Sequence, residues 1–380
     1  MLSRRTAHST ETNPFFLSLT LRRLEGRETI DLTVANPTDL ELPYNEEAIL
    51  AALADRRSLR YEPEPFGLPH ARSAAAATLG APASQVVLTT STSEAYSLLF
   101  KLLCDPDDDV LIPEPSYPLF EQLAQFESVR IVPYRLLYDG AWHVELDSIR
   151  RAIGPRTKAI VVVSPNNPTG NYVKRDELHA IAEHGLPIIS DEVFAEYNLR
   201  DVPGRVRSAI EVDGELMFAL NGLSKLCGMP QMKAGWMAVT GRSARVEETL
   251  SRLEMLLDSY LSVGTPVQHA LSRLIRVGET TRSVIRTRIR TNYHRAVLAL
   301  ANSAATVLDA EGGWYAVIRL PRVDTETNLA LQFLEEHGVF VHPGHFFDFL
   351  DEPYFVVSLL TPELEFERGM LELRKMVDHL

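Results

Sequence analysis

Short β-branched runs that end in polar turn residues constrain most strongly how this chain can fold. In chain order they begin at Val86, Val110, Ile160 and Ile188. Runs of this kind are typical of strands that are buried on both faces of a sheet. Apolar patterns with helical spacing separate them from about residue 40 to 270. This alternation predicts a mostly parallel sheet covered by helices.

The bulk properties of the chain exclude several classes of protein. Its 380 residues are enough for two domains, and 45% hydrophobic with 23% charged residues is normal for a globular enzyme. The formal net charge of −13 argues against nucleic-acid binding. No apolar run reaches the roughly 18 residues of a membrane helix, and we expect no signal peptide. Two cysteines without metal-ligand spacing predict no metal site and a reducing cytoplasm.

The stretch from Asn221 to Trp236, NGLSKLCGMPQMKAGW, carries the clearest chemical signal. Lys225 follows a turn of small residues, and a second cation, Lys233, comes eight residues later. Lysine forms a stable Schiff base with a carbonyl, so a positioned lysine indicates pyridoxal phosphate (PLP) chemistry, and the second cation suits a cofactor phosphate. In isolation, a Ser-Lys pair in a turn is more typical of a solvated loop.

Polar residues follow two of the predicted strands. Asn167 lies after the run that begins at Ile160, at the end of the strand where open α/β sheets bind ligands. Asp191 stands just past the run that begins at Ile188, where a carboxylate can keep a pyridine nitrogen protonated. The alternatives are an ordinary turn for the asparagine and a helix cap for the aspartate.

Two further turns offer cofactor contacts. Thr90, Ser91 and Thr92 precede an apolar helix, whose free N–H groups can bind phosphate, although plain N-capping would look the same. Tyr117 lies in a proline-flanked turn after the strand that begins at Val110. An aromatic ring there can stack on a flat cofactor or simply fill the core under a loop.

Taken together and in order, these blocks resemble the fold-type I PLP enzymes of the class I/II aminotransferase family. The resemblance extends from Leu32–Pro37 to Ser358 and includes Gly313–Tyr315. It implies an α/β, aspartate aminotransferase-like fold, with a large domain around a mostly parallel sheet and a smaller α+β domain. We predict that residues 1–38 pack on the small domain and the dimer interface. Residues 39–270 then form the PLP-binding domain, and 271–380 form the small domain.

The resemblance also implies roles for individual residues. Lys225 is expected to carry PLP as an aldimine and to shuttle a proton, and Asp191 to pair with the pyridine nitrogen. Asn167 is expected to donate to the 3-oxygen of the ring, and Tyr117 to stack on the ring. Tyr61 resembles the tyrosine that reaches the phosphate of the neighbouring subunit's cofactor, which implies a homodimer. The remaining expected cofactor contacts are Ser91, Thr92, Ser224 and Lys233.

Four positions depart from the family pattern. Phe194 replaces the tyrosine three residues after the aspartate, and Gly222 replaces a serine three residues before the lysine, with Ser224 as a possible substitute. Lys233 replaces an arginine. The largest departure is Val356, because the family has there the arginine that clamps the α-carboxylate of the substrate.

The sequence therefore predicts a cytoplasmic, homodimeric, PLP-dependent aminotransferase that moves an amino group between an amino donor and an oxo acid, both small molecules. A lyase or decarboxylase of the same fold is the alternative, because the same residues serve those reactions. A non-catalytic protein of this fold is a further alternative. A long helix around Thr280 to Ala301 is expected to lead into the small domain.

Overall fold

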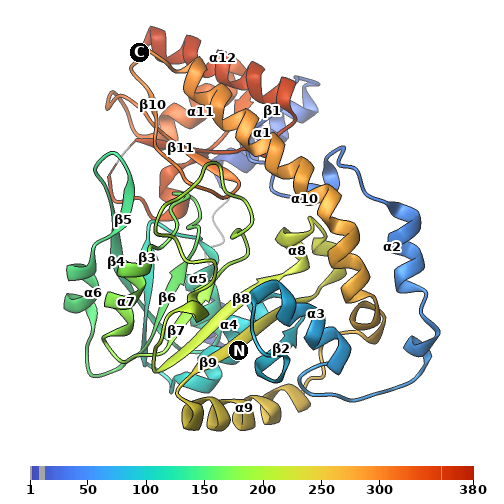
Figure 1. Ribbon diagram of the computed structural model, residues 1–380. Coiled ribbons are helices and arrows are strands. Elements are labelled where there is room, and N and C mark those ends of the chain that lie inside the picture. The colour runs from blue at the N-terminus through green and yellow to red at the C-terminus, as the bar shows by residue number, and fades with distance from the viewer. Residues whose placement is uncertain (1, 8–12, 352) are drawn as a thin grey trace.

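The computed structural model describes residues 2–7, 13–351 and 353–380, and the largest sheet within them has eight strands (Figure 1). They are β2 (Val86–Thr89), β3 (Asp109–Glu114), β4 (Arg130–Tyr138), β5 (Trp142–Val144), β6 (Thr157–Val163), β7 (Ile188–Asp191), β8 (Leu216–Gly222) and β9 (Gly235–Gly241). Their order across the sheet is β2-β9-β8-β7-β6-β3-β4-β5. Six of these strands run in one direction, and only β9 and β5 run in the opposite direction. The sheet is therefore mostly parallel, and the predicted fold class is confirmed.

Helices cover both faces of this sheet because alternate residues of each strand are apolar on both sides. Val161 of β6 packs in one cluster with α4, α5 and α9, whereas Val162 packs in another with α6 and α7. A third cluster joins β2 and β9 to α3 and to the first half of α10. The helices of this part are α2 (Glu46–Leu53), α3 (Pro69–Leu79), α4 (Thr92–Leu103), α5 (Leu119–Phe126), α6 (Leu146–Ala152), α7 (Arg175–Ala182), α8 (Leu223–Leu226) and α9 (Ser243–Asp258).

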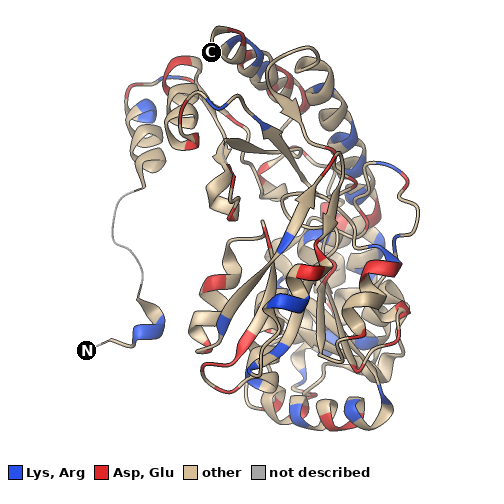
Figure 2. Cartoon of the chain, turned by 90° about the vertical axis from the view of Figure 1, so that its left-hand side faces the viewer, with Lys and Arg blue, Asp and Glu red and all other residues tan. Residues whose placement is uncertain are grey.

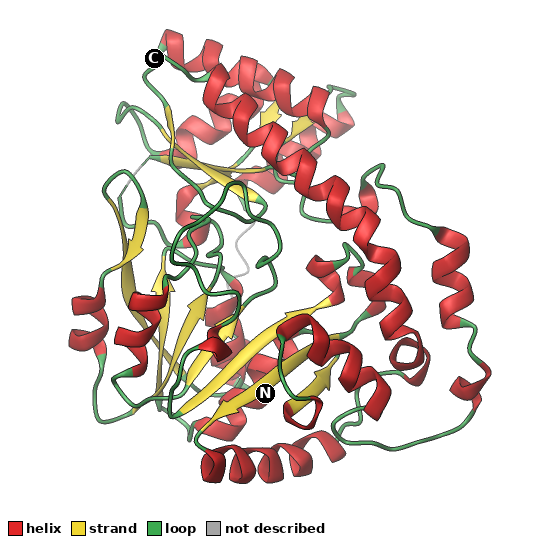
Figure 3. Ribbon diagram, in the orientation of Figure 1, coloured by secondary structure: helices red, strands yellow, loops and turns green. Residues whose placement is uncertain are grey.

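The small domain has its own sheet and core. Its strands lie beneath its helices at the top of Figure 3. The sheet order is β10-β11-β14-β13, and a separate parallel pair joins β1 to β12. The elements are β1 (Ile30–Asp31), β10 (Thr306–Val307), β11 (Tyr315–Arg319), α11 (Glu326–His337), β12 (Val339–Phe340), β13 (His342–Pro343), β14 (Tyr354–Ser358) and α12 (Glu363–His379).

The long helix α10 (Thr265–Ala299) connects the two parts, contacting α2 and α3 near its start and α12 further along (Figure 1). The sequence predicted a start near Thr280, which is wrong by about four turns. Gly278 and the threonines after it are poor helix formers, which hid the first half of the helix. Gly278 is needed there because a Cβ atom would lie 2.5 Å from Cβ of Cys227.

The N-terminal segment contacts both parts of the molecule. The helix α1 (Pro14–Leu24) packs on α11, and β1 pairs with β12, so these residues lie on the small domain. The short 3-10 helix η1 (Arg4–Thr6) lies instead on α5, where Arg5 donates to the carbonyl of Phe126 at 3.3 Å. The domain boundaries at 38 and 270 stay a prediction, and the second of them falls inside α10.

Charged side chains of both signs are interspersed over the outer helices. Figure 2 shows blue and red alternating along α9 at the bottom of the molecule, where Arg245 and Arg252 both pair with Glu248. Within the residues that the structure describes, no helix is both long and apolar enough to cross a membrane.

Candidate active site

The predicted site residues meet at one edge of the large sheet. The strands β6, β7 and β8 are parallel and end together at Val163, Asp191 and Gly222. The strand β9 runs the other way, so its first residue, Gly235, lies at the same edge. A cavity of about 340 Å³ opens there. Its lining includes eight of the nine predicted residues: Ser91, Thr92, Tyr117, Asn167, Asp191, Ser224, Lys225 and Lys233.

Lys225 lies in α8, directly after β8, and its side chain is largely buried. Its Nζ atom is 4.9 Å from the ring centre of Trp314 and 5.7 Å from that of Phe194. Burial lowers the pKa of Lys225 to about 8, although the nearby Asp191 carboxylate opposes this shift. The hydroxyl of Tyr197 donates to the Lys225 carbonyl at 2.6 Å and fixes the backbone. About a tenth of this amine is therefore neutral and nucleophilic at pH 7, a far larger share than for an exposed lysine.

Asp191 is the last residue of β7 and is buried. The hydroxyl of Tyr96 donates to its Oδ2 atom at 3.1 Å, and the Val193 amide donates to Oδ1 at 3.2 Å. Burial raises the pKa of Asp191 to about 6, and the hydrogen bonds from Val193 and Tyr96 and the charge of Lys225 only partly offset this shift. Among the described residues, no cation forms an ion pair with this carboxylate, which is therefore suited to a positively charged ligand atom.

Tyr96 contacts a predicted site residue, Asp191, but was not itself predicted from the sequence. It lies on the buried face of α4, among Ala95, Leu98 and Leu99. A phenol on such an apolar face needs a hydrogen-bond partner, and this was the available signal. That partner could not be identified from the sequence alone, because Asp191 lies 95 residues further along the chain.

The start of α4 borders the cavity as a third side, next to the ends of β6 to β8 and the start of β9. Ser91 is the N-cap, and its side chain accepts from the Glu94 amide at 3.2 Å. Gly235 allows β9 to approach this turn, because a Cβ atom there would lie 3.0 Å from the carbonyl carbon of Ser91. Thr92 and the exposed Lys233 complete this side of the lining. Hydroxyls, free amide groups and a cation together suit an anionic group such as phosphate.

Asn167 lies on the loop that follows β6 and is buried. Its Oδ1 atom has no hydrogen-bond partner within the described part of the chain. A buried amide without a partner that faces a cavity is suited to a polar ligand.

Aromatic rings surround the opening of the cavity. Tyr117, 42% exposed, contacts Phe120 edge-on, with 6.1 Å between ring centres. Tyr315, at the start of β11, lines the cavity from the small domain, and burial raises its pKa. The sequence analysis noted the block that contains Tyr315 but gave this residue no role.

Val356 does not line the cavity. It lies in β14, is 1% exposed, and pairs across the sheet with Val317 and His342. It packs in a cluster with Val317 and Phe347. Among the described residues that line the cavity, the cations are Lys225 and Lys233. The lining therefore contains no arginine that would hold a carboxylate.

Tyr61 is the one predicted residue that lies outside this cavity. Its side chain is 76% exposed and lines a separate cavity of about 50 Å³ with Gln268. Its predicted partner is the cofactor of a second subunit, which a single chain does not test.

A sequence profile described as "Aminotransferase class I and II" matches residues 27–364. This match spans both domains and all eight predicted residues that line the cavity. The chain belongs to the class I and II aminotransferase family.

Relatives and solved structures from this family resemble the chain along most of its length. The glutamate-pyruvate aminotransferase AlaA of Haemophilus influenzae is 29% identical over 65% of this chain, which spans 63% of that relative's length. The aspartate/prephenate aminotransferase of Thermus thermophilus is 28% identical over 86% of both proteins. The alanine aminotransferase structure from Pyrococcus furiosus has the same fold, with a TM-score of 0.89 over 100% of both chains at 23% identity.

The family uses pyridoxal 5′-phosphate, and the cavity fits this cofactor. The buried Asp191 carboxylate suits a protonated ring nitrogen, the Nδ2 donor of Asn167 in the cavity lining suits the 3-oxygen, and the start of α4 suits the phosphate. Gly222 explains one departure, because a Cβ atom there would lie 3.0 Å from the Ala234 carbonyl oxygen. A serine at this position would require the facing backbone of β9 to shift by a few tenths of an ångström, whereas Ser224 lines the cavity. Within the described residues, no group of three or more His, Cys, Asp and Glu could hold a metal ion.

Proposed function

We propose that this protein is a PLP-dependent aminotransferase that moves an amino group between a small amino donor and an oxo acid. The observation that carries the proposal is that Lys225 and Asp191 line one cavity whose third side is the start of α4. The lysine amine, the aspartate carboxylate and a turn suited to phosphate thus surround one cavity of about 340 Å³. The relatives named above are aminotransferases, which supports the same reaction.

In the proposed reaction, Lys225 is the attachment point of PLP and moves a proton through its Nζ atom. When bound, PLP withdraws electrons from the α-carbon of the substrate. A pKa of about 8 leaves part of the Lys225 amine neutral near pH 7.5, and the neutral form accepts a proton. Tyr197 holds the lysine backbone, and the rings of Trp314 and Phe194 keep water away from Nζ.

The other side chains hold the cofactor in this proposal. Asp191, kept in place by Tyr96 and the Val193 amide, keeps the ring nitrogen protonated. Asn167 would donate to the 3-oxygen of PLP, and Tyr117 would stack on its ring. Phosphate contacts come from the Ser91, Thr92, Ser224 and Lys233 side chains.

The substrate side of the cavity supports an unusual amino donor. With Val356 buried against Phe347 and Val317, the β14 strand offers no positive charge to an α-carboxylate. We therefore expect the preferred donor to have its carboxylate absent, masked or bound elsewhere. Free aspartate and glutamate are expected to be poor donors.

We also propose a homodimer with shared sites, in the cytoplasm. The exposed Tyr61 supports the first part, because a large aromatic side chain that is 76% exposed is available to a second subunit. The two free cysteines, Cys104 and Cys227, are consistent with a reducing compartment. Mixing Tyr61→Phe and Lys225→Ala subunits should give dimers more active than either parent, whereas a protein that is monomeric at working concentration would contradict sharing.

The reaction is tested by following the amino group itself. PLP-loaded protein with a ¹⁵N-labelled amine and an oxo acid should produce a labelled amino acid, and Lys225→Ala should produce none. Borohydride should fix PLP to Lys225, as read by peptide mass. Release of ammonia or carbon dioxide without a labelled product would support a lyase or a decarboxylase instead, and PLP fixed to another lysine would contradict the assignment.

A further inference from the structure

A short segment of the small-domain half of the chain runs between two loops of the large domain. The amides of Glu311 and Gly312 donate to the Gly170 carbonyl at 3.1 and 2.9 Å. On the other side, the Leu199 amide donates to the Glu311 carbonyl at 2.8 Å, and the Gly313 amide donates to the Tyr197 carbonyl at 2.9 Å. Residues 311–313 are therefore held by backbone hydrogen bonds on both sides.

Both loops and the segment lead directly into the cavity. The first loop, residues 164–173, carries Asn167, and the second, residues 191–199, begins at Asp191. Immediately after the segment come Trp314, beneath Nζ of Lys225, and Tyr315 in the cavity wall. A shift of this segment would thus change the distance between two walls of the cavity. One wall carries Asn167 and Asp191 of the large domain, and the other carries Tyr315 of the small domain.

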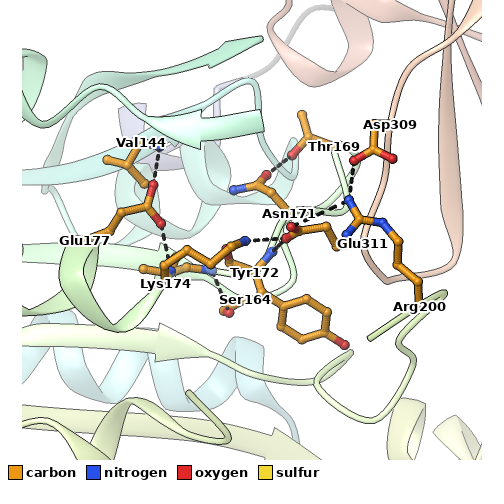
Figure 4. A network of polar contacts seen from close by, with 11 residues as sticks. Val144, Ser164, Thr169, Asn171, Tyr172, Lys174, Glu177, Arg200, Asp309 and Glu311 are labelled. Carbon is orange, nitrogen blue, oxygen red and sulfur yellow. Dashed lines mark hydrogen bonds and ion pairs between the residues drawn. The ribbon is translucent and has the colours of Figure 1, made fainter. Parts of the chain in front are cut away.

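The side chain of Glu311 adds a buried ionic contact to this junction (Figure 4). The residue is 7% exposed, and its Oε2 atom accepts from the Tyr172 amide at 2.8 Å and from Nζ of Lys174 at 2.5 Å. Arg200 approaches Oε1 at 3.8 Å and pairs with Asp309 at 2.5 Å. Tyr172 and Lys174 follow Asn167 by five and seven residues, so Glu311 binds the far end of the Asn167 loop.

Close packing makes this junction sensitive to displacement. A Cβ atom on Gly170 would lie 2.6 Å from the Gly312 carbonyl oxygen, and one on Gly312 would lie 2.7 Å from the Tyr172 ring. Inside the loop, Asn166 donates to Thr169 at 2.8 Å and to the Pro115 carbonyl at 3.1 Å. Among the described residues, no hydrogen bond holds the Asn167 side chain itself, so the position of its amide depends on the loop.

We propose that Glu311 is a positioning residue that, with Lys174, fixes the Asn167 loop against the small domain and so places the Asn167 amide on the cofactor. The inference rests on the proposed function only for the identity of the cofactor. Glu311 itself does not line the cavity, and it acts through the Tyr172 amide and the Lys174 ammonium group.

The test is the pH titration of bound PLP, followed by its visible absorbance. A hydrogen-bond donor to the 3-oxygen stabilises the deprotonated form and so lowers the midpoint of this titration. Asn167→Ala should raise the midpoint by about one pH unit, the size expected for a lost hydrogen bond to a charged group. Glu311→Gln, and separately Lys174→Met, should raise it by a smaller amount and weaken PLP binding up to ~10-fold. In an Asn167→Ala background, Glu311→Gln should cause no further shift, since the two changes act through one contact.

A matched control separates positioning from general stability. Glu215 also pairs with two arginines, Arg242 and Arg245, but lies at the opposite end of β8. Glu215→Gln should lower the thermal midpoint without moving the titration. An unchanged titration in folded, PLP-bound Glu311→Gln and Lys174→Met would overturn the role of Glu311 and leave the proposed function intact. A shift that persists in the Asn167→Ala background would also overturn it, and a wild-type protein that does not bind PLP would overturn both proposals.

Discussion

The two walls of the cavity differ in polarity. The wall built by the large sheet carries buried polar groups, among them Asp191, Lys225 and Asn167, at the ends of adjacent strands. The wall that faces it from the small domain contributes Tyr315, with the apolar Val356 and Phe347 behind it. The residues proposed to hold the cofactor therefore lie on one wall, and the wall proposed to meet the substrate carries no charged side chain among the described residues that line the cavity. The predictions below test each wall.

The largest effect is expected for Asp191→Asn on the polar wall. The variant should fold and bind PLP, but turnover should fall by orders of magnitude, because an amide does not keep the ring nitrogen charged. Steady-state rates and the spectrum of the bound cofactor measure this. Near-normal turnover would remove Asp191 from the reaction.

The same residue gives a pH prediction for the protein without PLP. Because the folded pKa of Asp191 is raised from 3.8 to about 6, the folded state holds the proton more tightly than the unfolded state. The contribution of Asp191 to the free energy of unfolding is therefore greatest below pH ~4. This contribution, on the order of 3 kcal/mol, is lost as the pH rises to about 6. At pH 7.5, Asp191→Asn without PLP should melt at a higher temperature than wild type, and PLP should stabilise wild type more. An unchanged melting temperature would contradict this.

A smaller effect is expected from adding a cation to the apolar wall. Val356→Arg should improve the reaction with glutamate about ten-fold relative to a donor without a carboxylate, because one hydrogen bond between charged groups contributes roughly 1.5–3 kcal/mol. Val356→Met is the control for the larger side chain, since overpacking this site destabilises the core. An unchanged preference in a folded Val356→Arg protein would show that the carboxylate never reaches β14.

The smallest effect concerns Phe194, where the two walls meet. Its ring lines the cavity and lies 5.1 Å from the centre of Trp314 in the small-domain core. Phe194→Tyr would add a donor to the 3-oxygen of PLP and should shift the absorbance titration to lower pH. An upward shift, or none in a folded variant, would contradict the argument.

The polar wall was more predictable from sequence than the apolar one, for a physical reason. β-branched runs mark strands, and strand ends locate Asp191 and Asn167 without knowledge of distant contacts. Tyr96 was not predicted because its partner, Asp191, lies 95 residues away in the sequence. Glu311 was not predicted because its partners, Tyr172 and Lys174, lie 137 or more residues away. The first half of α10 escaped because tertiary packing overrides the poor helix propensity of Gly278. The role of Tyr61 stays a prediction, because its predicted partner is the cofactor of a second subunit.

One measurement tests the contrast between the walls most directly. Phenylalanine and 2-phenylethylamine differ only in the α-carboxylate, and each can be mixed with PLP-loaded wild-type protein while the cofactor absorbance is followed. The account predicts faster conversion by 2-phenylethylamine, and slow conversion by glutamate, aspartate and alanine. Efficient conversion by glutamate or alanine would contradict it and would mean that an arginine outside β14 holds the carboxylate.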